Sequence, residues 1–298
     1  MLKLGTRKSP LAMRQSTMVA DALKSIQPGL EVELIGFQTS GDAFLEKSLQ
    51  AVGGKGLFVK ELEEALLAET IDFAVHSMKD MPPDGPEGLT LLPFGRRENP
   101  SDAFVSIKYA SLKEMPEGSV IGTSSVRRQV LINHSAPHLK VELLRGNIHT
   151  RLQKLAEGQY DAILLATAGL KRMGLESRIR EELPVTEFIP SCGQGLLAVQ
   201  CRQGDVGLLK LLSETVDFET MTAWLMEKAF QRAMGADCHT PMGAYASRLP
   251  GGEFQLLAFL ADSDSEKLCF ESVTVPAAQT VQAAEKLAQT FKSKCQIR

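Results

Sequence analysis

Short aliphatic segments alternate with helical patterns along most of this chain, and this alternation constrains the fold more than any other feature. Residues 2–6 predict a strand, and Ser9-Pro10 then supply an N-cap and a proline at the first position of a helix that extends towards Ser25. Strands separated by helices form βαβ units, which build parallel or mixed sheets. The sequence therefore predicts an α/β fold.

The alternation occurs twice, so two sheets are expected. The first set predicts strands at residues 2–6, 32–39, 73–76 and 89–94, with a helix at 57–68. The second set begins near Asp102 and predicts strands at residues 103–106, 120–122, 141–144 and 162–166, with helices at 126–133 and 148–156. Residues 196–201 are expected to return as a strand to the first sheet.

The pattern changes after the second sheet. A helix at about 219–234 precedes strands at 244–248, 254–261 and 268–275 and a last helix at about 281–292, an order typical of a small α+β domain with an antiparallel sheet. A chain of 298 residues has room for two or three domains. We expect three: residues 1–95 with 196–214, residues 96–195, and residues 215–298.

Composition narrows the functional class. The hydrophobic content of 44% suffices for a core, and the net charge of -3 argues against a general nucleic-acid binder. The first fifteen residues carry basic side chains without an apolar stretch, and no apolar run is long enough to span a bilayer. We expect a cytoplasmic protein without a membrane partner. The five cysteines show no Cys-x-x-Cys spacing, so neither a disulfide framework nor a structural zinc site is implied.

Arginines recur where predicted strands end. Arg7, Arg127, Arg128 and Arg145 follow strands, and Arg151 lies just inside the next helix. Open α/β sheets bind ligands at the carboxyl ends of their strands, and a guanidinium matches the oxygens of a carboxylate or phosphate. Solvated surface arginines are the alternative. We favour an anion-binding site.

Two strand-to-helix turns reinforce this interpretation. Thr123, Ser124 and Ser125 start a helix, whose free N–H groups and dipole favour an anion. Gly146 and Asn147 follow Arg145 in a second turn, where a plain turn glycine with solvated neighbours is an equally good explanation.

Residues 75–82 place a lysine and a carboxylate after a third strand. Lys79 can fix an anion, while Asp80 can take a proton or stabilise a cation. A surface ion pair is the ordinary explanation of such a pair, and neighbouring Ser77 and His76 raise the functional interpretation only slightly.

Two further segments suggest other chemistries. Residues 52–58 resemble a nucleotide-binding P-loop, but Leu49 stands where its first glycine belongs and Gly56 follows Lys55, so no hydroxyl is available for magnesium and nucleotide binding is rejected. Cys238 beside His239 suggests a thiolate nucleophile, although neighbours in sequence rarely pair in this way. A loop cysteine between a helix and a strand could instead be an attachment point.

Taken together, eight segments resemble the hydroxymethylbilane synthase (porphobilinogen deaminase) family in order and approximate spacing, and the resemblance covers essentially the whole chain. They are residues 6–12, the glycine-lysine loop 53–56, residues 76–82, 122–128, 144–147, 168–172, 193–195 and 238–241.

The resemblance implies two periplasmic-binding-protein-like α/β domains flanking a cleft, plus a small C-terminal α+β domain with an antiparallel sheet. It implies a monomeric transferase of porphyrin and haem biosynthesis, which releases ammonia as it joins four porphobilinogen molecules into a linear tetrapyrrole. It also implies a dipyrromethane cofactor made from two substrate molecules and held by a thioether, here to Cys238.

The resemblance carries residue roles as well. Asp80 matches the family's catalytic aspartate. The side chains expected to hold the carboxylates of cofactor and substrate are Arg7, Ser9, Lys55, Ser77, Lys79, Thr123, Ser124, Ser125, Arg127, Arg128, Arg145, Gly146, Asn147, Arg151, Arg172 and Gln194. No metal is expected. The segment 53–56 is the expected lid.

Two positions depart from the commonest family pattern. Asp237 precedes the attachment cysteine where glycine is frequent, and Cys192 places another thiol before Gly193. Two rival functions are open to the sequence: a two-domain carboxylate receptor that turns nothing over, and a cysteine hydrolase that would bring a distant histidine to Cys238. The candidates for that histidine are His76, His134, His138 and His149.

Overall fold

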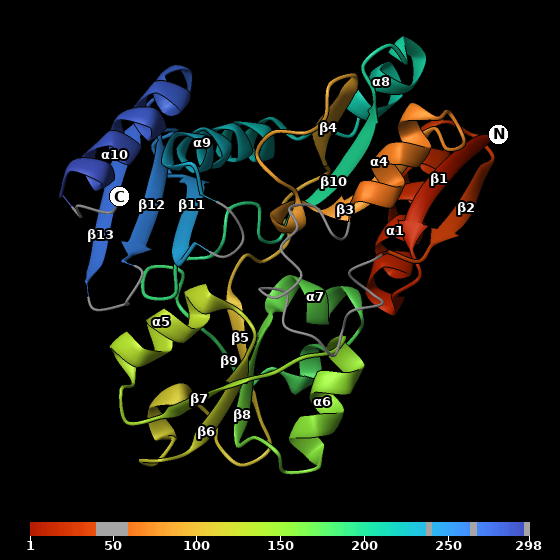
Figure 1. Ribbon diagram of the computed structural model, residues 1–298. Coiled ribbons are helices and arrows are strands. Elements are labelled where there is room, and N and C mark those ends of the chain that lie inside the picture. Colours follow the sequence, from red (N-terminus) through yellow and green to blue (C-terminus); the bar gives the residue numbers. More distant parts are fainter. Residues whose placement is uncertain (40–58, 237–239, 263–266, 295–298) are drawn as a thin grey trace. The chain divides into compact units, whose positions relative to one another are not determined.

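The computed structural model describes residues 1–39, 59–236, 240–262 and 267–294, and its ribbon is shown in Figure 1. The chain forms two compact units. The first comprises Met1–Arg97 and Leu196–Thr220, and the second comprises Glu98–Gly195 and Met221–Arg298. The second unit contains both of the later domains expected from the sequence except residues 96–97 and 215–220, so the division into three domains stays a prediction.

The first unit is built on a five-stranded mixed sheet in the order β2-β1-β3-β10-β4. Its strands are β1 (Leu2–Arg7), β2 (Val32–Phe37), β3 (Phe73–Ser77), β4 (Leu89–Phe94) and β10 (Leu197–Arg202). The β1 strand runs parallel to β2 and β3, whereas β10 lies between β3 and β4 and runs antiparallel to both. The expected return of the chain to the first sheet is confirmed.

Helices cover both faces of this sheet. The apolar stripes of α1 (Pro10–Ile26) and α8 (Val206–Ser213) pack with Leu4 and Phe73 in one cluster. Helix α4 (Lys60–Leu67) packs Leu62 against Ile71 in another. Gly5 permits this second contact, because a Cβ there would lie 2.3 Å from the Cδ1 of Ile71.

The second unit contains another five-stranded mixed sheet, ordered β7-β6-β8-β5-β9. Its strands are β5 (Asp102–Ser106), β6 (Val120–Thr123), β7 (Lys140–Leu143), β8 (Ala162–Ala166) and β9 (Glu181–Glu182), and its helices are α5 (Val126–Ser135), α6 (Ile148–Ala156) and α7 (Thr167–Arg172). The β6 strand runs parallel to β7 and β8, and β5 runs antiparallel to β8.

The C-terminal part of this unit is a three-stranded antiparallel sheet, β11 (Met242–Arg248), β12 (Phe254–Ala261) and β13 (Leu268–Val275), with helices α9 (Phe218–Met234) and α10 (Thr280–Lys294). Alternation along β12 decides its packing. Phe254 and Leu256 join α9 and α10 in one core, whereas Phe259 and Ala261 join the core of the preceding sheet.

The predicted fold class is confirmed, with two mixed α/β sheets and a small antiparallel sheet. The predicted bounds of β4, β8, α6, β12 and β13 coincide with those observed. The helices α7 and α8 and the short strand β9 were not predicted. Helix α7 starts directly at the end of β8, so no turn marks its start, and Asp205 at the N-cap of α8 makes no side-chain hydrogen bond to that helix.

The cysteines require a correction. Cys192 and Cys201 are buried and form no disulfide, but Cys269 of β13 is disulfide-bonded, which the sequence did not indicate. In the part of the chain that the structure describes, no helix combines the length and the apolar character needed to cross a membrane.

Candidate active site

In the first unit, the predicted side chains gather at one edge of the sheet. Arg7 ends β1 and Ser77 ends the neighbouring parallel strand β3, while β10 starts opposite Ser77. Ser9 follows as the N-cap of α1, where its side chain accepts a hydrogen bond from the backbone N–H of Ala12 at 3.4 Å. The amide Nε2 of Gln15 in the same helix donates to Oγ of Ser77 at 3.0 Å. The sheet and α1 therefore fix this edge together.

A single 3-10 turn, η1 (Met78–Asp80), carries the predicted catalytic carboxylate. Met78 is buried and its N–H donates to the carbonyl oxygen of Leu196 at 3.0 Å, which anchors the turn to the sheet. Lys79 is half-buried and Asp80 is exposed. An anchored turn thus presents a carboxylate to solvent, where it can stabilise a cation or move a proton.

His76 is the buried neighbour of this turn. Burial lowers the pKa of His76 to about 4, and the positive charge of Arg7 lowers it further, against a hydrogen bond with Gln200 that raises it. At neutral pH the imidazole is therefore uncharged and adds no positive charge beside Asp80.

In the second unit, strand pairing also brings several strand ends to one edge of the sheet. Thr123 pairs with Leu143 at the ends of the parallel strands β6 and β7. The strand β8 runs parallel to them and ends at Ala166, which pairs with Asp102 at the start of antiparallel β5. Asp102 consequently lies at the edge where the arginine-bearing turns begin.

Asp102 holds both arginines of the Gly122–Arg128 segment. Its Oδ2 accepts from Arg127 at 2.6 Å and its Oδ1 accepts from Arg128 at 2.7 Å, and the three side chains are buried. Each guanidinium also donates to a carbonyl oxygen, Arg127 to Ile189 at 2.8 Å and Arg128 to Leu164 at 3.0 Å. Sequence analysis missed this carboxylate; its signal was an acidic residue at the head of an apolar strand.

In this cluster the charges do not cancel, and some hydrogen-bond donors have no acceptor among the described residues. Burial alone would raise the pKa of Asp102, but the two guanidiniums and the Gln194 amide hold that pKa well below its usual range. One carboxylate against two guanidiniums leaves one positive charge in excess. The Nε donors of Arg127 and Arg128 are buried and have no hydrogen-bond partner among the described residues. Such donors are rare in a stable interior, so the cluster is suited to an anionic ligand.

The three hydroxyl residues predicted in this unit lie between the end of β6 and the start of α5. Oγ1 of Thr123 accepts from the N–H of Ser125 at 3.2 Å, and the Ser125 side chain caps the helix by accepting from the N–H of Arg128 at 3.4 Å. Oγ of Ser124 accepts from Arg151 of α6 at 3.3 Å. These bonds link the starts of α5 and α6.

The turn between β7 and α6 is shaped by a glycine. Gly146 has φ of 115°, and Asn147 caps α6 by accepting from the N–H of Thr150 at 3.0 Å. Nε of Arg151 donates to the carbonyl oxygen of Gly146 at 2.7 Å. The Nε of Arg145 is buried without a hydrogen-bond partner among the described residues, which makes it a third donor of this kind.

Arg172 and Gln194 complete the predicted set in this unit. Arg172 donates to the carbonyl oxygen of Gly195 at 2.6 Å, and burial lowers its pKa to about 10, an effect that Glu98 opposes. The Gln194 amide donates to Oδ1 of Asp102 at 2.8 Å and to the carbonyl oxygen of Pro100 at 2.7 Å. Both side chains therefore contact the protein, and their contact with a ligand stays a prediction.

Several predicted features lie outside the described residues, namely Lys55 with the loop 53–56, Cys238 and Asp237. Of the described residues, no group of three or more histidine, cysteine, aspartate and glutamate side chains could hold a metal ion.

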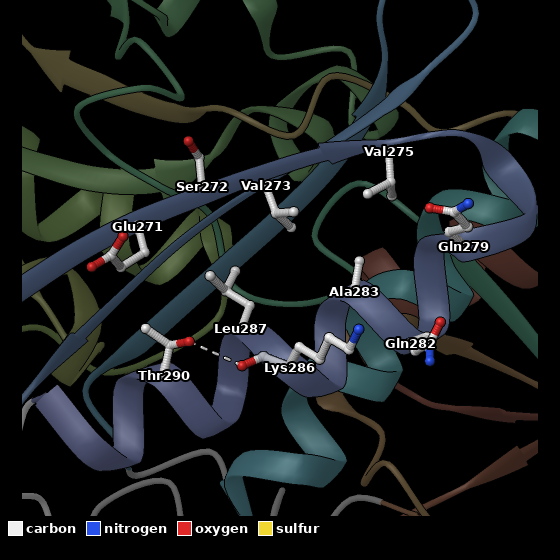
Figure 2. A pocket seen from close by; sticks show the side chains of 10 residues that line it. All are labelled: Glu271, Ser272, Val273, Val275, Gln279, Gln282, Ala283, Lys286, Leu287 and Thr290. Atoms are coloured by element: carbon white, nitrogen blue, oxygen red, sulfur yellow. Dashed lines mark hydrogen bonds between the residues drawn. The ribbon is translucent and has the colours of Figure 1, made fainter.

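A cavity of about 360 Å³ lies between β13 and α10 (Figure 2). Val273 and Val275 line it from the strand, and Lys286 and Leu287 line it from the helix. It contains none of the side chains expected to act on a ligand.

Two family models match this chain. Residues 2–210 match the model described as "Porphobilinogen deaminase, dipyromethane cofactor binding domain", and residues 221–294 match "Porphobilinogen deaminase, C-terminal domain".

Similar whole sequences carry the same description. The porphobilinogen deaminase of Laribacter hongkongensis is 46% identical over 293 residues, which cover 98% of this chain and 93% of that protein. That of Thiobacillus denitrificans is 47% identical over 266 residues, which cover 89% of this chain and 87% of that protein.

Among solved structures, a putative methionine-binding lipoprotein from Bacillus subtilis is similar over 74% of this chain and 92% of its own chain. Its TM-score is 0.46 and its sequence identity is 11%, which is too distant to support a function. The two family models and these relatives show that the chain belongs to the porphobilinogen deaminase family.

Proposed function

We propose that this protein is a hydroxymethylbilane synthase, a transferase that removes ammonia from four porphobilinogen molecules and joins them head to tail into the linear tetrapyrrole hydroxymethylbilane. The observation that carries the proposal is the buried cluster around Asp102, which has an excess positive charge and guanidinium Nε donors without a partner among the described residues, in a chain of net charge -3. Membership of the porphobilinogen deaminase family supplies the substrate class.

The substrate chemistry suits this cluster. Each pyrrole of porphobilinogen bears an acetate and a propionate, so a growing chain presents many carboxylates. We assign their binding in the second unit to Arg127, Arg128 and Arg145, whose Nε donors are buried without partners among the described residues. The hydroxyl-bearing start of α5, at the positive end of the helix dipole, extends the anion site.

The dipyrromethane group fits the same residues, because it carries the same acetate and propionate side chains as the substrate. When bound, it supplies a covalently held pyrrole carbon to which substrate units are joined. We propose Cys238 as its attachment point, on the basis of the family resemblance. The arginine cluster would hold its carboxylates, and the buried, low-dielectric setting would strengthen each contact.

Asp80 is the proposed catalytic group. Its carboxylate is exposed on a turn that Met78 anchors, so it can approach a ligand without disturbing the sheet. There it would stabilise the positive charge that develops on the pyrrole ring as ammonia leaves, and accept or return a proton. Lys79 and Arg7 would hold substrate carboxylates at this edge. Monomeric state, cytoplasmic location and the absence of a nucleic-acid partner belong to the same proposal.

Intact mass spectrometry tests the proposal directly. The purified protein is expected to be heavier than its sequence by two linked pyrrole units, and a Cys238→Ser variant is expected to have the bare mass and no synthase activity. Cys201→Ser is the matched control, since Cys201 is a free buried thiol of the first unit and should leave the adduct in place.

Other outcomes would change the conclusion in defined ways. Bare masses for all three proteins after incubation with porphobilinogen would refute the synthase and favour a carboxylate receptor that turns nothing over. An adduct retained by the Cys238→Ser protein would move the attachment to another thiol, with Cys192 tested next.

A further inference from the structure

A glutamate outside the predicted site lies fully buried in α9. Glu227 has a relative exposure of 0%, and each of its carboxylate oxygens accepts a backbone N–H. Oε2 accepts from Gly193 at 2.7 Å, and Oε1 accepts from Ala246 of β11 at 2.8 Å. One side chain therefore joins the C-terminal sheet to the turn that ends the preceding part of the unit.

That turn presents a predicted site residue. Gly193 and Gly195 have φ of 72° and 89°, the left-handed conformations that glycine adopts without strain, and Gln194 stands between them. The Gln194 amide donates to Asp102, which binds Arg127 and Arg128. Hydrogen bonds thus connect β11 through Glu227 to Gly193, and Gln194 through Asp102 to the arginine pair, with the peptide bond between Gly193 and Gln194 as the covalent link.

The burial of the Glu227 carboxylate argues against a purely structural role for this residue. A carboxylate in a core costs free energy unless its oxygens are satisfied, and apolar replacements of buried charges are often neutral or stabilising. Its neighbours in α9, Met226 and Phe230, belong to the apolar core. A purely structural position on this helix face would be served by a residue of that kind. Two backbone donors from separate segments, in contrast, require a group with two acceptor oxygens.

We propose that Glu227 is a positioning residue for the carboxylate-binding arginines. It fixes the Gly193–Gly195 turn, the turn aims Gln194 at Asp102, and Asp102 orients Arg127 and Arg128. The proposal rests on the proposed function, because the arginines are expected to bind the carboxylates of porphobilinogen and of the growing chain.

A Glu227→Gln variant tests this role. The amide has one acceptor oxygen, and its NH₂ group cannot accept from a backbone N–H, so one of the two bonds is lost. We expect the KM for porphobilinogen to rise on the order of ten-fold with kcat changed far less, because a carboxylate contact serves ground and transition states alike. Glu227→Asp keeps both acceptor oxygens and is expected to lie between the wild type and Glu227→Gln.

The matched control is Phe230→Leu, one turn further along α9 in the same core. It should lower thermal stability and leave KM unchanged. A double-mutant cycle with Gln194→Ala then separates positioning from general damage. If Glu227 acts through Gln194, the double variant has the KM of Gln194→Ala alone. Multiplied effects on KM, or an equal rise in KM in Phe230→Leu, would overturn the inference.

Amide hydrogen exchange provides a readout that does not depend on activity. In Glu227→Gln the segment 190–196 should exchange faster than in the wild type and in Phe230→Leu. Unchanged protection there would refute the positioning role even in an active enzyme. An inactive wild type with increased exchange in the variant would instead refute the synthase assignment while leaving the coupling of Glu227 to the turn intact.

Discussion

At the residue scale, Asp102 stands between two guanidiniums that burial has removed from water. Asp102→Asn would leave both charges uncompensated, and we expect a loss of about 3–5 kcal/mol in the free energy of unfolding at pH 7. Denaturant unfolding of the wild type and of Asp102→Asn measures this loss. The control is Asp161→Asn, whose ion pair with Lys108 lies at the surface and should matter far less.

The pH dependence of this effect follows from the depressed pKa of Asp102, which guanidinium charge causes against the opposing effect of burial. Because the folded pKa lies below the unfolded value of about 3.9, the contribution is complete above that pH and is lost as the pH falls below it. The stability difference between wild type and Asp102→Asn should therefore shrink in acid. A constant difference down to pH 2 would contradict the assigned charge state.

His76 gives a second pH prediction, with the same sign but at higher pH. Its folded pKa of about 4 lies below the unfolded value of about 6.5, so the unfolded chain binds the proton first and stability falls as the pH drops from 6.5 to 4. The resulting loss in the free energy of unfolding is on the order of 3 kcal/mol. His76→Asn should flatten the stability profile over this interval, whereas the exposed His149→Asn should not. Chemical unfolding at several pH values compares the three proteins.

At the scale of elements, a glycine lies near each end of α6. Substituting each of them tests how the strand-to-helix turn before this helix is built. A Cβ on Gly146 would lie 2.8 Å from the Cβ of Thr150, in a backbone with φ of 115°. Gly158, after the helix, has φ of 77° but no atom within 4 Å of such a Cβ. Gly158→Ala should cost about 1 kcal/mol, and Gly146→Ala about 3 kcal/mol.

Activity distinguishes the two ends further. Gly146 accepts from Arg151 and follows Arg145, so Gly146→Ala should also raise the KM for porphobilinogen, while Gly158→Ala should leave it unchanged. Steady-state kinetics beside thermal unfolding would show this. Equal KM values in the two variants would remove the turn from the binding site.

At the scale of the whole molecule, the net charge of -3 means that any attraction for an anionic substrate must be local. Salt shortens the range of such attraction from about 10 Å at 0.1 M to about 3 Å at 1 M. The KM for porphobilinogen should therefore rise with salt concentration, with a weaker dependence in Arg145→Gln. A KM independent of salt in the wild type would argue against binding by the strand-end arginines.

The sequence predicted most elements because their local signals agree with the tertiary fold. The alternation in β12 and the Ser9-Pro10 start of α1 are examples. It could not assign partners across the chain: the carboxylate that binds Arg127 lies 25 positions away, in a strand that looked purely structural. Glu227 was missed for the same reason, since its two backbone partners become neighbours only in the folded unit.

The position of β10 within its sheet has a consequence for how this polypeptide folds while the ribosome makes it. This strand is inserted between β3 and β4, although more than a hundred residues separate it from either in sequence. While a ribosome makes the intervening segment, the emerging sheet lacks an interior strand and exposes the facing edges of β3 and β4. Exposed edges invite pairing with other chains. We expect the nascent N-terminal segment to depend on chaperones until β10 has left the exit tunnel.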